Sequence, residues 1–129
     1  MSIRVLIVDD SKFSRALIKN SIPKNTFSIA GEASDGQDGF EAYQELNPDI
    51  VIMDMNMKYM NGAEAIEKII DYDSEAIIIV CSALGTEHKV KKAISSGAID
   101  FVVKPVDSAN ISKALKKAKQ KLILQRTQK

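Results

Sequence analysis

The feature that most constrains the fold of this chain is a series of short, mainly apolar runs. Five such runs, rich in Val and Ile, occupy residues 3–8, 27–33, 50–53, 76–80 and 101–103. Each run is too short for a buried helix, and four are continuous rather than alternating, which is typical of strands covered on both faces in a parallel sheet. The second run contains Gly31 and Glu32, so we expect it to form a more exposed edge strand.

Between these runs the apolar residues recur with the spacing of amphipathic helices. Two such segments begin near Gly36 and Gly62, and a third ends near Gly97. The last begins at a cap at Asp107 or Ser108. Alternating strands and helices of this kind predict a doubly wound α/β fold. We expect five parallel strands in the flavodoxin-like order 2-1-3-4-5, with five helices.

Length and composition are those of a single globular domain. The chain has 129 residues, is 45% hydrophobic and has a net charge of +1, which excludes a disordered chain and a strongly basic nucleic-acid binder. The first apolar run meets two acids at once, so it is not a signal peptide, and no apolar segment has the length of a membrane span. We therefore expect a cytoplasmic domain over residues 1–124, followed by a polar tail at 125–129 that frays.

Charged and hydroxyl side chains fall where the predicted strands end. Asp9 and Asp10 follow the first strand and Asp54 the third, while Ser82 follows the fourth and Lys104 the fifth. Ligands of open parallel sheets bind outside the carboxyl ends of the strands, and the first and third strands are neighbours in the predicted order. Three carboxylates should therefore converge on one crevice, with an ammonium and a hydroxyl group facing them.

Three carboxylates in one crevice repel one another, which raises their pKa values or requires a cation. An all-oxygen site suits a hard divalent ion, and Mg²⁺ prefers one or two carboxylates with waters and a phosphate oxygen. Taken alone, Asp9 or Asp10 would be better explained as a helix N-cap. The set of three acids together with Lys104 and Ser82 favours a cation site.

Four segments that carry these residues resemble the signatures of response-regulator receiver domains from two-component signalling. They are LIVDDS at 6–11, VIMDMNM with MNG at 51–62, VCSA at 80–83 and FVVKP at 101–105. Each segment alone is weak, but their order and spacing together are highly specific. The resemblance covers residues 1–124, and because nothing follows the fifth helix, the chain is most similar to single-domain chemotaxis regulators of the CheY type.

The resemblance implies a role for each residue at the strand ends. Asp54 would accept a phosphoryl group from a histidine of a sensor kinase or from a small donor. Asp10, Asp54 and the backbone carbonyl of Asn56 would hold Mg²⁺, for which Mn²⁺ could substitute, and Asp9 would act through a metal-bound water. Lys104 would bind the phosphoryl oxygens and, in the free state, pair with Asp54.

The resemblance also implies a switch. Ser82 would donate a hydrogen bond to the phosphoryl group, and the ring of Phe101 would turn inward, which reshapes the surface of the fourth helix, fifth strand and fifth helix. Ala83, which is small, would leave the phosphoryl site open. In this family a cis peptide bond precedes the residue that corresponds to Pro105, and it orients the lysine before it.

One departure from the family pattern lies in the loop after Asp54. Lys58 stands where the family usually has proline, so the loop keeps its backbone freedom and gains a positive charge beside the acidic crevice. We expect a more mobile loop in which Lys58 could approach the phosphoryl group or a partner. A solvated surface lysine is the simpler interpretation of this residue.

The implied function is that of a signalling protein, which catalyses only its own phosphoryl transfer and dephosphorylation. The donor would be a CheA-like sensor histidine kinase or a phosphotransfer protein, and the target a protein such as a flagellar motor switch. A phosphate sink or a phosphorelay intermediate outside chemotaxis stays open as an alternative. We expect no nucleic-acid partner, no membrane insertion, and a monomer or a weak phosphorylation-dependent dimer.

Two other classes of protein share part of this pattern. A phosphatase of the haloacid-dehalogenase class also uses a strand-end aspartate with Mg²⁺, but it expects a second acid where this chain has Asn56, and this chain has no room for a substrate cap. A flavin binder would need a hydroxyl- and glycine-rich loop after the first strand. Asp9 and Asp10 occupy that position and would repel a bare phosphate.

Overall fold

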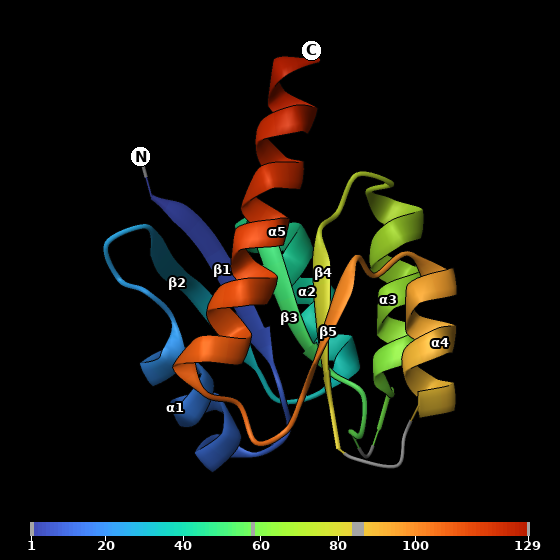
Figure 1. Ribbon diagram of the computed structural model, residues 1–129. Coiled ribbons are helices and arrows are strands. Elements are labelled where there is room, and N and C mark those ends of the chain that lie inside the picture. The colour runs from blue at the N-terminus through green and yellow to red at the C-terminus, as the bar shows by residue number, and fades with distance from the viewer. Residues whose placement is uncertain (1, 58, 84–86, 129) are drawn as a thin grey trace.

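The computed structural model describes residues 2–57, 59–83 and 87–128, in which five strands and five helices alternate (Figure 1). The strands are β1 (Ile3–Val8), β2 (Phe27–Ala33), β3 (Ile50–Asp54), β4 (Ile78–Ser82) and β5 (Asp100–Val103). The helices are α1 (Lys12–Ser21), α2 (Gly36–Leu46), α3 (Gly62–Tyr72), α4 (Glu87–Ser96) and α5 (Ser108–Thr127).

The strands form one parallel sheet in the order β2-β1-β3-β4-β5, which confirms the predicted topology. Strands β1 and β3 are neighbours at the point where the winding of the chain reverses, and Val8 pairs with Met53 in their register. The residues that follow this pair are Asp9 and Asp54. The register therefore brings the two acids together at the carboxyl edge of the sheet.

The sheet is covered on both faces, and each face has its own apolar core. Val5 and Ile7 belong to the core shared with α1 and α5, whereas Leu6 and Val8 belong to the core shared with α2, α3 and α4. All five residues of β3 are buried. Because successive side chains of a strand point to opposite faces, a strand buried on both faces needs an unbroken apolar sequence.

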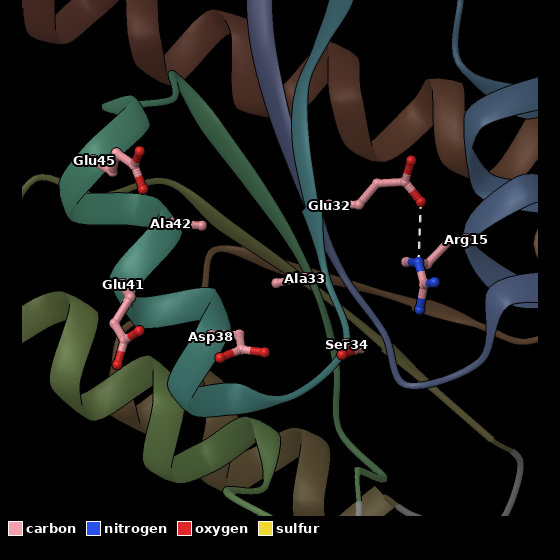
Figure 2. A pocket seen from close by; sticks show the side chains of 8 residues that line it. All are labelled: Arg15, Glu32, Ala33, Ser34, Asp38, Glu41, Ala42 and Glu45. Carbon is pink, nitrogen blue, oxygen red and sulfur yellow. Dashed lines mark hydrogen bonds and ion pairs between the residues drawn. The ribbon is translucent and has the colours of Figure 1, made fainter.

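Strand β2 lies at one edge of the sheet and is partly exposed over residues 28–31, as predicted. A cavity of about 380 Å³ opens beside it (Figure 2). Its walls carry acidic side chains from β2 and α2 and one basic side chain, Arg15 of α1. Arg15 and Glu32 point toward one another across the edge of the sheet.

The C-terminal segment differs from the expected fraying tail. Helix α5 runs to Thr127, the Gln125 side chain donates to the carbonyl of Glu75 at 2.9 Å, and Arg126 forms an ion pair with Asp49. Residues 125–127 thus form the last turn of the helix, and the side chains of Gln125 and Arg126 reach acceptors just before β4 and β3. Within the described part of the chain, no helix is both long and apolar enough to cross a bilayer.

Gly62 brings α3 against the backbone that follows β3. A Cβ atom at this position would lie 2.6 Å from the carbonyl oxygen of Asp54 and 2.8 Å from the Cα of Met55. Since backbone atoms cannot move aside cheaply, Gly62→Ala should lower the free energy of unfolding by about 1–3 kcal/mol in urea denaturation. Gly31→Ala is the control, because its Cβ would meet only the flexible end of Leu46. Equal losses in the two variants would contradict this explanation.

Candidate functional site

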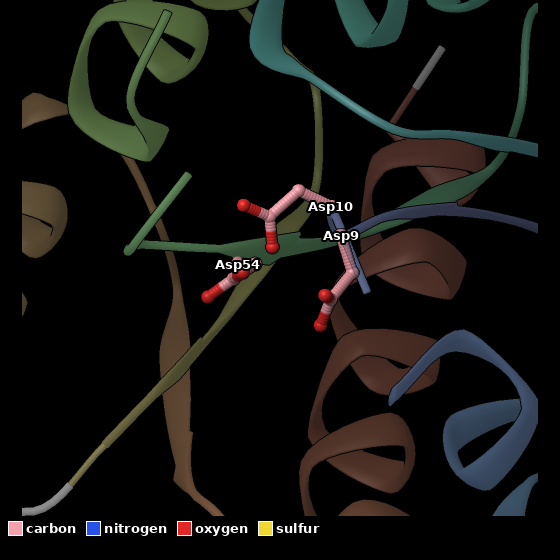
Figure 3. A group of neighbouring side chains, drawn as sticks. All are labelled: Asp9, Asp10 and Asp54. Atoms are coloured by element: carbon pink, nitrogen blue, oxygen red, sulfur yellow. The ribbon is translucent and has the colours of Figure 1, made fainter. Parts of the chain in front are cut away.

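Three carboxylates meet around the ends of β1 and β3 (Figure 3). One carboxylate oxygen from each of Asp9, Asp10 and Asp54 lies within 4.8 Å of the others. Asp9 is 0% and Asp54 3% exposed, whereas Asp10 faces solvent. The site therefore combines two buried acids with a third at the boundary with water.

Asp9 makes hydrogen bonds through its backbone N–H and through both oxygens of its carboxylate. Its backbone N–H donates to the carbonyl of Ala33 at 3.0 Å, its Oδ1 accepts from the N–H of Ser11 at 2.9 Å, and its Oδ2 accepts from Lys104 at 3.0 Å. Helix α1 is capped instead by Ser11, whose side chain accepts from Ser14 N–H. The interpretation of Asp9 or Asp10 as a helix cap is therefore wrong.

Lys104 bridges the two buried acids. Its Nζ lies 3.0 Å from Asp9 Oδ2 and 3.3 Å from Asp54 Oδ1, so the expected pairing with Asp54 is joined by a hydrogen bond to Asp9. Burial by itself would lower the pKa of Lys104, but Asp54 and Asp9 outweigh it and raise that pKa, which keeps the ammonium charged. The peptide bond between Lys104 and Pro105 is cis, in agreement with the family resemblance.

Negative charge remains in excess at the site. Burial is the main cause that raises the pKa of Asp54 above its ordinary value, and the charge of Asp9 adds to it. The Asn56 N–H, 3.1 Å from Asp54 Oδ1, and the Lys104 ammonium oppose this shift without cancelling it. Among the residues that the structure describes, three carboxylates face the Lys104 ammonium, and all their donor atoms are hard oxygens, so they fit a divalent cation such as Mg²⁺.

The predicted switch residues lie on β4 and β5 and just after β4. Ser82 ends β4 and is 1% exposed, Ala83 after it is exposed, and Phe101 on β5 is 46% exposed. Ser82 and Phe101 both line an apolar cavity of about 250 Å³, which Val90 of α4 also lines. Ser82 and the half-exposed ring of Phe101 thus share the wall of one apolar cavity.

Two contacts at the site were not predicted from the sequence. The Nζ of Lys89 donates to the Asn56 side-chain oxygen at 3.0 Å, which joins α4 to the loop after Asp54. The Nη1 of Arg15 donates to the carbonyl of Asp9 at 2.7 Å. Neither lysine nor arginine stands out from the many basic residues on helix surfaces, so no sequence signal marks them. Lys58 lies outside the described residues.

The raised pKa of Asp54 makes its charge a cost to stability. The folded protein holds the Asp54 proton more tightly than the unfolded chain, so stability falls as the pH rises through this range. Asp54→Asn should therefore raise the free energy of unfolding at neutral pH in metal-free buffer with EDTA. The gain should shrink at acidic pH, where the wild-type carboxyl is protonated in the folded state.

Urea denaturation at neutral and acidic pH measures both effects. Asp71→Asn on α3 is a matched control, because Asp71 is exposed and its replacement should change stability little. A loss of stability in Asp54→Asn at neutral pH would contradict the excess of negative charge inferred for the site.

Comparison with known proteins agrees with this geometry. Residues 5–116 match the response regulator receiver domain family. The chain is 49% identical to the chemotaxis protein CheY of Thermotoga maritima and 43% identical to that of Bacillus subtilis, in each case over 91% of this chain and 98% of the relative. A solved CheX–CheY complex with BeF₃ and Mg²⁺ from Borrelia burgdorferi is 35% identical, with a TM-score of 0.83 over 89% of this chain and 87% of that chain.

These similarities cover nearly all of the chain and separate it from the other two classes considered, the haloacid-dehalogenase phosphatases and the flavin binders. The two relatives are chemotaxis proteins. The segments that match them include nearly all of the single-sheet domain seen in the structure. The chain belongs to the response-regulator receiver family and is similar to its CheY proteins.

Proposed function

We propose that this receiver domain accepts a phosphoryl group on Asp54 in the presence of Mg²⁺ and answers by rearranging the surface of α4, β5 and α5. The observation that carries the proposal is the arrangement around Asp54. Its carboxylate is buried at the end of a central strand, 3.3 Å from the Lys104 ammonium and in one cluster with Asp9 and Asp10.

Asp54 acts as the nucleophile in this proposal. Its Oδ1 is contacted by Asn56 N–H and lies next to Lys104, so we assign the attack on phosphorus to Oδ2. A new P–O bond forms while the bond from phosphorus to the donor histidine nitrogen breaks, and that nitrogen keeps the electron pair. Lys104 turns its ammonium toward the phosphoryl oxygens, where it stabilises the charge that develops.

The ligand set for the metal follows from burial and from the contacts already made. Asp10 is exposed and can bind a cation directly, together with Asp54 and the carbonyl of Asn56. Both oxygens of Asp9 already accept hydrogen bonds, from Ser11 and Lys104, which supports contact through a water. When bound there, Mg²⁺ offsets the negative charge of the phosphoryl group, and Mn²⁺ could substitute for it.

Incubation with acetyl phosphate and Mg²⁺, followed by intact mass spectrometry, tests this function. We expect the mass to increase by one phosphoryl group, and we expect EDTA or the substitution Asp54→Asn to abolish the increase. An adduct that survives Asp54→Asn, or no adduct in the wild type, would overturn the proposal.

Lys104→Met separates the phosphoryl contact from metal binding. We expect the adduct to form at least about tenfold more slowly, because a preorganised cation at the transferring group is lost. Mg²⁺ affinity should not fall, since the variant removes a positive charge that lies 3.0 Å from Asp9 and 3.3 Å from Asp54. Weaker Mg²⁺ binding in Lys104→Met would argue that the lysine serves the metal site instead.

The switch proposal rests on Ser82, Phe101 and the cavity between them. A phosphoryl group on Asp54 would accept a hydrogen bond from the Ser82 hydroxyl and draw the end of β4 toward it. Phe101 stands half-exposed at a 250 Å³ apolar cavity that its ring could fill, and burial of the ring would favour that second state. The small side chain of Ala83 leaves room for this movement.

Amide hydrogen exchange with and without beryllofluoride and Mg²⁺ tests the switch, since beryllofluoride mimics the phosphoryl group. We expect the exchange rates of α4 and β5 to change. The rates of α2, which packs against β2 and β1 at the far end of the sheet from β5, should stay the same. Ser82→Ala should still form the acetyl phosphate adduct but lose this response. Uniform change, or none, would contradict a switch built on α4 and β5.

The proposed partners are a sensor histidine kinase or phosphotransfer protein as donor and a chemotaxis protein, such as a flagellar motor switch, as target. Support comes from the relatives named CheY and from the Borrelia burgdorferi complex, in which CheY is bound to CheX. A cytoplasmic location and a monomer or weak dimer belong to the same proposal. A phosphate sink or relay intermediate needs no moving surface, so an unchanged α4 and β5 would favour that alternative.

A further inference from the structure

The Arg15 side chain of α1 joins the acid cluster to the edge of the sheet. Its Nη1 donates to the backbone carbonyl of Asp9 at 2.7 Å. Its Nε donates to Glu32 Oε1 at 3.0 Å, the contact drawn as a dashed line in Figure 2. The side chain is only 17% exposed. An arginine held at two separate nitrogens has little freedom to rotate, so its position is well determined.

Glu32 of β2 holds Arg15 in place and also contacts Lys19. The Nζ of Lys19 lies 2.8 Å from Glu32 Oε2, so the two basic residues use different oxygens of one carboxylate. The hydrogen bond from Lys19 is the main cause that lowers the pKa of Glu32; burial opposes it as the second-largest effect, and the bond from Arg15 lowers this pKa further. Glu32 therefore stays charged and anchors Arg15 to the edge strand.

The carbonyl that Arg15 contacts lies in the peptide unit between Asp9 and Asp10. That unit is planar, so its orientation sets the direction in which the backbone of Asp10 leaves it. The N–H of Asp9 is fixed separately by the carbonyl of Ala33 at 3.0 Å. Arg15 thus contacts the peptide plane that precedes Asp10, whose exposed carboxylate lies in one cluster with that of Asp54.

We propose that Arg15 is a positioning residue for the metal site. By holding the Asp9 carbonyl it keeps the Asp10 carboxylate within reach of a cation shared with Asp54, and Glu32 holds Arg15 for this purpose. The inference rests on the proposed Mg²⁺ site and extends it to a residue and an edge strand that make no contact with the metal themselves.

Because Arg15 is positively charged, the direction in which its removal changes the Mg²⁺ affinity distinguishes two explanations. A positive side chain near a cation site repels the cation, so removing it should strengthen Mg²⁺ binding if charge alone mattered. A positioning role requires the opposite result, because the released peptide unit lets the Asp10 carboxylate leave the geometry that the cation needs. The two explanations therefore predict opposite changes for one substitution.

The test is the affinity of the full chain for Mg²⁺, measured by calorimetry without any phosphoryl donor. We expect Arg15→Met to weaken binding by about tenfold, as is typical when a residue that orients a metal ligand is removed. Lys19→Met is the matched control, because Lys19 carries the same charge and contacts the same carboxylate of Glu32. Unlike Arg15, it has no described contact with the Asp9 carbonyl. We expect its Mg²⁺ affinity to be unchanged or slightly higher.

Two further variants keep the test decisive if Arg15→Met folds poorly. Arg15→Lys keeps the charge but has one nitrogen where two are needed, and it should lose affinity almost as Arg15→Met does. Glu32→Gln should weaken Mg²⁺ binding by about two- to threefold, and it should add nothing when combined with Arg15→Met. Rescue by Arg15→Lys, or full additivity of the two changes, would contradict the positioning role.

Wild-type or tighter Mg²⁺ affinity in Arg15→Met overturns this inference alone. A wild-type chain that binds Mg²⁺ but forms no adduct with acetyl phosphate overturns the proposed phosphoryl transfer and leaves the inference about Arg15 intact. The two failures are distinguishable because the affinity measurement uses the metal alone.

Discussion

Repulsion among the carboxylates at the carboxyl edge of the sheet is the constraint on which the rest of the site depends. Asp9 and Asp54 are buried side by side, where like charges interact strongly because little water screens them. The Lys104 ammonium contacts both and offsets part of the repulsion, but within the described part of the chain it does not balance three acids. The remaining negative charge suits a divalent cation, and a cation in turn suits a phosphoryl group.

The sheet holds this unfavourable charge in place because its central strands are buried on both faces. Asp9 and Asp54 stand at the ends of β1 and β3, and the register between these strands fixes where their backbones lie at the carboxyl edge. The core therefore holds the backbone beneath these two acids, and the proposed movement belongs to the margin of the site. Phe101 and α4 lie there, around an apolar cavity that a close-packed core would not contain.

Much of this could be predicted from the sequence, and the errors have physical causes. Strand identity, strand order and the strand-end acids follow from apolar runs and from the rules of parallel sheets. The helix cap at Ser11 was missed because Asp9 and Asp10 are equally good caps by residue type. The tail was expected to fray because its polar side chains have no local partners. Their partners, Asp49 and Glu75, come from distant parts of the chain.

The sequence by itself determined which residues end the strands, and thereby which acids could meet. Local periodicity contains that information because it reports burial along one element at a time. Only the tertiary structure decided which side chains hold the acids: Lys104 on Asp9 as well as Asp54, Arg15 on the Asp9 carbonyl, and Lys89 on Asn56. Such contacts depend on the packing between elements and on the rotamers that it permits, and no pattern within one element records them.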